Sequence, residues 1–325
     1  MKRLILFSTG ILIFLVTLFG GCQRVKPARA EGKINVISVI FPGYDFVRAV
    51  AGDRVNLVLL LPPGTESHSY EPSARDIIAI KESDLFIYSG GESTKWVDRI
   101  LGAAELSDRK IKILKLMALV DAVKEEIVEG MEDDEADKNP ADNNPAEKVP
   151  AYDEHVWTSP KNAKVITAAI TEALCVLDSA NSGFYRQNAA DYGARLDDLD
   201  ASFRSIIEGA KRNTVVFGDR FPFRYFADAY GLKYFAAFPG CSAETEPSAA
   251  TVAFLINKIK SENIPVVFHI ELSNEKMAVA ISEATGAKKL LFHSCHNVTK
   301  RDFESSVNYL DLQKRNADHL KEALW

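Results

Sequence analysis

Residues 34–64 read INVISVIFPGYDFVRAVAGDRVNLVLLLPPG, and this stretch decides the fold. Two continuous apolar runs, Ile34–Ile40 and Val55–Leu61, flank a segment with helical spacing, Tyr44–Ala51, and a Pro-Gly turn closes the unit. Strands that are apolar throughout, rather than at alternate residues, are typical of a parallel sheet covered by helices on both faces. The stretch therefore predicts a strand, a helix and a second strand of an α/β fold.

The same alternation continues along the chain and is interrupted by one long helical segment. The sequence EPSARDIIAIKESDLFIYSGG predicts a helix capped by Ser73 and a buried strand, Leu85–Tyr88. In residues 184–210 the apolar side chains recur at helical spacing, which predicts a helix about 40 Å long. Strands and helices then alternate again up to a last helix, Ser305–Leu324. We predict two doubly wound α/β lobes joined by one long rigid helix.

The predicted organisation has five parts. They are a lipoprotein signal peptide (1–21), a tether (22–33), an N-terminal α/β lobe (34–160) that carries an acidic flexible loop (123–150), linking helices (161–212) and a C-terminal α/β lobe (213–325). The loop is rich in acids, Asn and Pro and offers almost nothing to bury, which favours a solvated segment. A second interpretation, that its acids gather cations near a site, stays open.

The N-terminus has the form of a secretory signal. Lys2 and Arg3 precede an almost unbroken apolar stretch, Leu4–Phe19, and two glycines lead to Cys22. A cysteine directly after small residues indicates a bacterial lipoprotein in which Cys22 carries the lipid. The alternative is a single membrane-spanning helix, for which the stretch is barely long enough. We expect the remainder to be soluble and anchored at the extracytoplasmic face of a bacterial membrane.

Charge and cysteine content restrict the function further. A net charge of −6 argues against nucleic-acid binding, which requires a basic face. Besides Cys22 there are three cysteines, and in an oxidising compartment one disulfide with one remaining thiol is expected. Cys175 lies on an amphipathic helical segment, whereas Cys241 and Cys295 lie in turn-like segments. A disulfide between Cys241 and Cys295 is our prediction.

Three of the six histidines lie where an α/β protein binds ligands. His68 follows a Pro-Pro-Gly turn after a buried strand, His155 ends the acidic loop, and His293 ends a predicted strand of the second lobe. Ligands of open α/β sheets bind beyond the carboxyl ends of the strands. The three side chains form a constellation rather than a short motif, so an ordinary loop histidine is the alternative at each position.

Five segments of the chain carry a family resemblance. They are PPGTESHSYEPSARDI, DEHVWTSPKNA, YRQNAADYGARLDDLD, YFADAYGL and ETEPS, in that order. Together they resemble the metal-binding lipoproteins of zinc and manganese ABC importers, the cluster A-I or zinc-uptake solute-binding proteins, over about Ile34–Leu324. The resemblance implies two lobes bridged by a rigid helix, with two ligands from each lobe holding one divalent cation. It also implies a carrier that delivers its ion to the membrane subunit of an ABC permease; we expect a monomer.

The resemblance assigns two of the four ligands directly. His68 and His155 match the first two family ligands without a gap. The third position falls on Gly218 or Arg220, depending on the side from which the match is counted, and neither residue suits a cation. Asp219 is the nearest plausible substitute.

The fourth position of the family falls on His293, counted forward from Gly286. His296, three residues later, is a further candidate, and it could instead hydrogen-bond within its own turn. Glu271 is another carboxylate close to the expected cleft. Three histidines and one carboxylate favour Zn²⁺, whereas a second carboxylate shifts the site toward Mn²⁺.

Two other classes of function compete with a carrier. One is a zinc hydrolase with Glu271 as its base, although the sequence contains no nucleophile motif. The other is a surface adhesion lipoprotein whose metal is only structural. We expect a binding protein and not an enzyme, because a closed four-ligand shell leaves no position for a reacting water.

Overall fold

The computed structural model describes residues 32–67, 69–102, 111–131, 151–242 and 247–325. The predicted signal peptide, Cys22 and most of the tether lie outside the described residues, as do His68 and residues 132–150 of the predicted acidic loop. Among the described residues we find no helix that combines the length and the apolar character needed to cross a bilayer.

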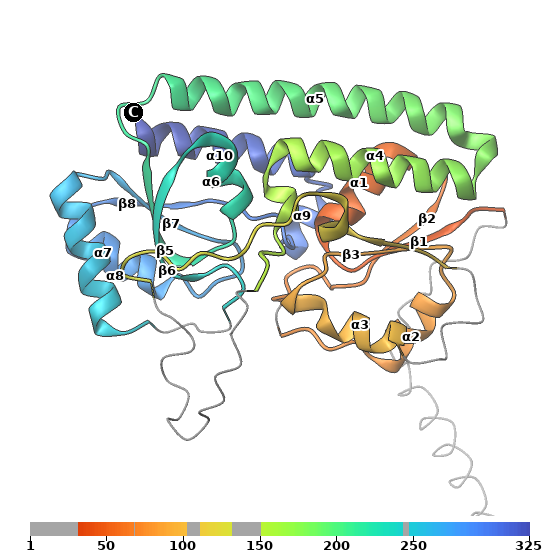
Figure 1. Cartoon of the computed structure of the whole chain (residues 1–325), viewed down its shortest axis with the longest axis horizontal. Coiled ribbons are helices and arrows are strands. Elements are labelled where there is room, and N and C mark those ends of the chain that lie inside the picture. The colour runs from red at the N-terminus through yellow and green to blue at the C-terminus, as the bar shows by residue number, and fades with distance from the viewer. Residues whose placement is uncertain (1–31, 68, 103–110, 132–150, 243–246) are drawn as a thin grey trace, which may run out of the picture. The chain divides into compact units, whose positions relative to one another are not determined.

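The first half of the chain forms a four-stranded sheet in which every pairing is parallel, with the order β2-β1-β3-β4. Its strands are β1 (Asn35–Ser38), β2 (Asn56–Leu59), β3 (Leu85–Tyr88) and β4 (Lys112–Lys115), and its helices are α1 (Phe41–Ala51), α2 (Ala74–Lys81) and α3 (Lys95–Gly102). In Figure 1, α1 lies on one side of this sheet, and α2 and α3 lie on the other. Helices on both faces are the expected doubly wound arrangement.

The start of α2 follows from its sequence. Ser73 Oγ accepts a hydrogen bond from the backbone N–H of Asp76, and the Asp76 carboxylate accepts one from the backbone N–H of Ser73, at 2.8 Å. This reciprocal capping box satisfies two donors that a helix N-terminus otherwise leaves unpaired. The predicted cap at Ser73 is therefore confirmed.

The second half of the chain builds another all-parallel sheet with the order β6-β5-β7-β8. Its strands are β5 (Thr214–Phe221), β6 (Lys233–Pro239), β7 (Val266–His269) and β8 (Lys288–Leu291), and its first helices are α6 (Arg224–Tyr230), α7 (Ala249–Glu262) and α8 (Lys276–Thr285). Val216 packs in one apolar cluster with Leu255 of α7, whereas its neighbour Phe217 belongs to the larger cluster that contains Leu320. Both faces of this sheet are thus buried, which explains its continuous apolar strands.

Two consecutive helices, α4 (Pro160–Leu177) and α5 (Ser182–Glu208), connect the sheets. Helix α5 has 27 residues and begins and ends two residues before the predicted segment. It contacts α1 and α4 as well as α6 and α10, and Figure 1 shows it running past both sheets. The prediction of two lobes with a bridging helix is confirmed. Residues 34–325 form one compact unit, so the exact lobe boundaries stay a prediction.

The C-terminal helix begins later than predicted. Residues 300–304 form a short helix, α9 (Lys300–Glu304), and Ser306 has a φ of 55°, which a continuous right-handed helix does not allow. A new helix, α10 (Tyr309–Leu324), then starts behind a capping box between Asn308 and Asp311. The predicted start at Ser305 is wrong because helical periodicity does not reveal a local reversal of the backbone.

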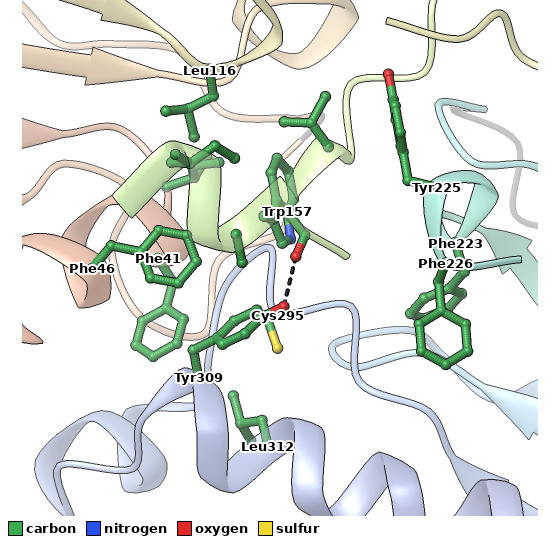
Figure 2. Packing of buried hydrophobic residues seen from close by; sticks show 14 of the residues in the cluster. Phe41, Phe46, Leu116, Trp157, Phe223, Tyr225, Phe226, Cys295, Tyr309 and Leu312 are labelled. Atoms are coloured by element: carbon green, nitrogen blue, oxygen red, sulfur yellow. Dashed lines mark hydrogen bonds between the residues drawn. The ribbon is translucent and has the colours of Figure 1, made fainter. Parts of the chain in front are cut away.

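Trp157 and Tyr309 lie together in the buried cluster between α1 and α10 (Figure 2). The Tyr309 hydroxyl donates to the Trp157 carbonyl at 2.7 Å, and the Tyr309 backbone N–H donates to Asp45 of α1 at 2.7 Å. The Tyr309 ring also meets Phe46 edge-on, with ring centroids 5.1 Å apart. These contacts attach the start of α10 to the first half of the chain and to the segment that carries His155.

We predict that Tyr309→Phe lowers the free energy of unfolding by about 1–3 kcal/mol, because it leaves the buried Trp157 carbonyl without its donor. Urea unfolding of residues 23–325 measures this change. Tyr152→Phe is the matched control, since Tyr152 is 47% exposed, and it should change stability by less than about 0.5 kcal/mol. Equal effects of the two substitutions would contradict the prediction.

Candidate metal centre

A small cavity lies where the carboxyl ends of both sheets meet. Its walls come from the segment after β2 (Thr65–Ser67), from His155, from the end of β5, and from the segments after β5, β6, β7 and β8. Ligands are expected at this edge of parallel sheets. The cavity measures about 30 Å³, which is room for about two water molecules. A space of this size suits an ion rather than an organic molecule.

His155 enters the cavity wall from the residue before a single helical turn, Val156–Thr158. The imidazole is 1% exposed, and its Nδ1 lies 3.1 Å from Oδ1 of Asp153, which also accepts the His155 backbone N–H at 2.7 Å. Because a carboxylate can only accept, Nδ1 carries the proton and Nε2 keeps its lone pair for a cation. Burial lowers the pKa of His155, but the Asp153 carboxylate outweighs it, so the pKa is raised overall.

His296 reaches the same cavity from the loop after β8. Its Nδ1 lies 3.2 Å from the Oγ of Ser67, and its ring centroid is 5.3 Å from that of His155 at an interplanar angle of 81°. The two imidazoles therefore lie edge to face across the junction of the two halves.

The indole of Trp157 supports both imidazoles. Its centroid lies 5.5 Å from that of His155 and 5.0 Å from that of His296, both in edge-on geometry. Its Nε1 donates to the Ser294 carbonyl at 2.8 Å, within the loop that carries His296. Trp157 thus fixes the distance between the two histidines.

In the described part of the chain, Glu154, His155 and His296 form a group able to hold a metal ion, with one ligand atom from each lying within 4.8 Å of the others. All three residues are buried. Burial raises the pKa of Glu154 to about 7, and the neighbouring His155 opposes that rise. Glu154 was not among the candidate ligands predicted from sequence, although an acid directly before the candidate ligand His155 is a signal that could have identified it.

The segment that carries the predicted ligand His68 reaches the cavity. Ser67, its neighbour in the chain, lines the wall and contacts His296. His68 itself lies outside the described residues. Its assignment as a ligand therefore stays a prediction.

His293 takes a different position from His296. Its Nδ1 accepts the backbone N–H of Cys295 at 2.9 Å, its own backbone N–H donates to Asn316 of α10 at 2.7 Å, and it does not line the cavity. Its Nε2 is buried and has no hydrogen-bond partner among the described residues. Burial lowers the pKa of this imidazole, while Glu271 beside it acts in the opposite direction. The structure thus brings His296, and not His293, together with His155.

Glu271 lines the cavity, but its carboxylate is engaged by the loop that carries His296. Oε2 accepts the Ser294 backbone N–H at 2.7 Å, and Oε1 accepts the Ser294 hydroxyl at 2.5 Å and the His296 backbone N–H at 3.2 Å. The carboxylate therefore holds the loop in its turn and directs His296 toward the cavity.

Asp219 lies outside the cavity wall. Its Oδ1 accepts the backbone N–H of Arg220 at 2.8 Å, and its Oδ2 accepts that of Ile270 at 3.3 Å. Burial raises its pKa, and these hydrogen bonds oppose the rise. In the structure Asp219 links the end of β5 to the end of β7.

The two positions matched to the third family ligand have clear structural reasons for their residues. A Cβ at Gly218 would lie 2.7 Å from the Cα of Ala278, so α8 leaves no room for a side chain there. Arg220 lines the cavity, and its guanidinium donates to Oε1 of Glu66 at 3.3 Å and to the Ser242 carbonyl at 3.2 Å. Glu66 comes from the first half and Arg220 from the second, so this ion pair joins the halves beside the histidines.

The predicted disulfide is not formed. Cys175, Cys241 and Cys295 are free thiols in the structure. Cys295 is buried next to α10, where its sulfur accepts from Nε2 of Gln313 at 3.4 Å, whereas the backbone N–H of Cys241 donates to Glu125 at 2.8 Å. Burial raises the pKa of both thiols well above its usual value. The prediction failed because a turn-like sequence around each cysteine does not show whether the two cysteines are neighbours in the fold.

The chain matches the family described as "ZnuA: Zinc-uptake complex component A periplasmic" over residues 36–323. The chain belongs to this family. The resemblance found in the sequence is thereby confirmed, and the family is one of transport components.

Named relatives agree with this assignment. The "High-affinity zinc uptake system protein ZnuA" of Bacillus subtilis (strain 168) is 32% identical over 320 residues, which cover 98% of this chain and 97% of the relative. The "Zinc-binding lipoprotein AdcA" of Streptococcus pneumoniae (strain R6) is 30% identical over 99% of this chain, but the chain spans only 61% of that relative's length.

A solved structure shares the fold. The Zn(II)-bound ZnuA-like domain of Streptococcus pneumoniae AdcA has a TM-score of 0.72 and 29% sequence identity, over 90% of this chain and 99% of that domain. The two-lobe architecture of the present chain is thus that of a zinc-bound relative.

We predict that Glu271→Gln destabilises the protein by about 1.5–3 kcal/mol, because an amide cannot replace a carboxylate that accepts bonds at both oxygens. The amide protons of Ser294 and His296 should exchange faster with solvent, as hydrogen–deuterium exchange would measure. Glu275→Gln is the control in the same segment, since Glu275 is 42% exposed and pairs with Lys289 and His269 rather than with the loop after β8. Unchanged exchange in Glu271→Gln would show that this carboxylate does not hold the loop.

Proposed function

We propose that this chain is an extracytoplasmic solute-binding lipoprotein that captures Zn²⁺ and delivers it to the membrane subunit of an ABC permease. The observation that carries the proposal is the pair of buried imidazoles, His155 and His296, which meet in an ion-sized cavity between the two halves. Family membership supports transport, and the zinc-binding relatives support the choice of ion. Attachment to the membrane through lipid at Cys22 and action as a monomer belong to the same proposal.

The proposed imidazole ligands are His68, His155 and His296. Imidazole nitrogens suit Zn²⁺, whereas Mn²⁺ prefers sites richer in oxygen, so Mn²⁺ is the secondary cargo. Glu271, Asp219 and His293 act as positioning residues in this proposal, because their polar atoms hold the backbone around the cavity.

The cavity supports a carrier rather than an enzyme. A space of about 30 Å³ accommodates a cation but no organic substrate beside it. Glu271, the candidate hydrolytic base, already accepts three hydrogen bonds from the loop after β8. We therefore propose that the bound ion is cargo and not a catalyst.

Release of the ion is proposed to start in the loops and not in a hinge. Helix α5 contacts helices of both halves, which opposes a large opening motion. The segment after β2 and the loop after β8 meet at Ser67 and His296, and the ion pair of Glu66 with Arg220 lies beside them. A partner that pulls the segment after β2 away would separate the ligands of the two halves while the core stays packed.

We predict that purified residues 23–325 bind one Zn²⁺ ion tightly in a competitive titration against Mn²⁺ and a chromophoric chelator. His155→Ala and His296→Ala should each weaken zinc binding by at least about 100-fold, and His68→Ala should do the same. His319→Ala is the control, since His319 contacts the Leu291 carbonyl away from the cavity. Absence of zinc binding above background in the unaltered protein would overturn the proposed function.

Removal of the ion gives a second test. A structural metal supplies folding energy, so a protein that needs one unfolds in chelator, whereas a carrier must stay folded without its cargo. We predict that the circular dichroism spectrum and a cooperative thermal transition persist in excess chelator. The melting temperature should rise when zinc is restored.

We further predict that Asp153→Asn weakens zinc binding by about 10–100-fold, because the carboxylate that orients His155 and holds its proton on Nδ1 is lost. The same titration measures it. Asp197→Asn, at a side chain that is 61% exposed, is the control and should leave the affinity unchanged.

A further inference from the structure

We infer that Glu154 is a direct ligand of the bound ion, through its Oε1 atom, beside the imidazoles of His155 and His296. This inference rests on the proposed function and specifies the oxygen ligand of the site. Neither the sequence patterns nor the match to the family assigned a role to this residue.

The first observation is an unpartnered carboxylate oxygen. Glu154 is 0% exposed, and its Oε2 accepts the backbone N–H of Ser93 at 2.9 Å. Its Oε1 is buried without a hydrogen-bond partner among the described residues. A buried carboxylate oxygen that has lost water and gained no donor is costly, and a cation supplies the missing interaction.

The second observation is its place relative to the histidines. One carboxylate oxygen of Glu154 and one ring nitrogen from each of His155 and His296 lie within 4.8 Å of one another. Two ligands of one tetrahedral Zn²⁺ lie about 3.3 Å apart, so small side-chain rotations bring the three atoms onto a common ion. The adjacent Asp153 does not compete, since its Oδ1 is engaged by the backbone N–H and Nδ1 of His155.

Glu154 does not itself line the cavity, but the metal group places it beside His155 and His296, and the other carboxylates near the site differ from it. Both oxygens of Glu271 accept hydrogen bonds from the loop after β8, and both oxygens of Asp219 accept backbone N–H groups. Arg220, on the cavity wall, has no acceptor atom and cannot ligate a cation. Among these groups Glu154 alone combines burial with an oxygen that lacks a donor.

The chain also makes room for Glu154 in this position. Gly91 has a φ of 77°, and a Cβ there would come within 2.5 Å of Oε2 and 2.6 Å of the Cβ of Glu154. The loop after β3 thus passes close to the glutamate, and its Ser93 N–H holds one oxygen in place. The other oxygen is held in advance of binding, which reduces the ordering cost of taking up the ion.

The test compares Glu154→Gln with Glu125→Gln in competitive zinc titrations of residues 23–325. Glu125 is a second partly buried glutamate nearby, which accepts from the Cys241 backbone and is not part of the metal group, so its variant removes a similar charge without a ligand. We expect Glu154→Gln to weaken zinc binding by at least about 100-fold and Glu125→Gln by less than about threefold. Glu154→Asp should fall between these values because it keeps the charge but shortens the reach.

A crystal structure of the zinc-loaded, unaltered protein tests the inference without any variant. A distance of about 2.0–2.2 Å between Zn²⁺ and Oε1 of Glu154 is the expected result. Tight zinc binding by Glu154→Gln, or an ion more than about 3 Å from Oε1, would overturn the role of Glu154 and leave the carrier function intact. Failure of the unaltered protein to bind zinc would instead overturn the proposed function itself.

Discussion

The packing of Trp157 against both candidate imidazoles is the constraint on which the geometry of the site depends. Its indole contacts His155 and His296, its Nε1 holds the loop after β8, and its carbonyl receives the Tyr309 hydroxyl. Through Tyr309 the same contacts extend to α1 and α10 (Figure 2). A shift of either imidazole would therefore disturb the main buried cluster. Close-packed interiors resist large shifts, so folding already holds the two candidate imidazoles close together, and only small rotations are left for ion binding.

Carboxylates of one chemical type perform three different tasks around this cavity. Asp153 fixes the tautomer of His155, Glu271 clamps the loop that presents His296, and Glu154 is left with an oxygen that accepts no hydrogen bond in the described part of the chain. The tasks differ because the surrounding backbone and side chains place a different number of N–H and O–H donors around each carboxylate. The chemical group, its charge and its proximity to the histidines are similar for all three carboxylates. The distribution of donors is therefore the property that distinguishes a positioning acid from a ligand.

Much of the fold was predictable from sequence because it follows from periodicity. The strand Leu85–Tyr88, the cap at Ser73 and the length of α5 all derive from local patterns. Counting residues forward from Gly286 could not show that His296, rather than His293, lies in the cavity. β8 ends at Leu291, and Cys295 has a φ of 63°, which reverses the chain between the two histidines. The break before α10 likewise arises from a positive φ, at Ser306. For Glu154 the sequence offers only its place directly before His155, whereas the absence of a donor to Oε1 among the described residues is a property of the packed structure.

The small volume of the cavity has a consequence for the kinetics of uptake. An aqueous divalent ion carries a hydration shell of several waters, and a space of about 30 Å³ admits the ion only after most of that shell is lost. Capture therefore requires stepwise replacement of water by imidazole and carboxylate. Mg²⁺ dehydrates reluctantly, and Ca²⁺ takes six to eight oxygen ligands, whereas the candidate ligands here include two imidazoles. For the proposed carrier, the work of dehydration therefore favours Zn²⁺ over Mg²⁺.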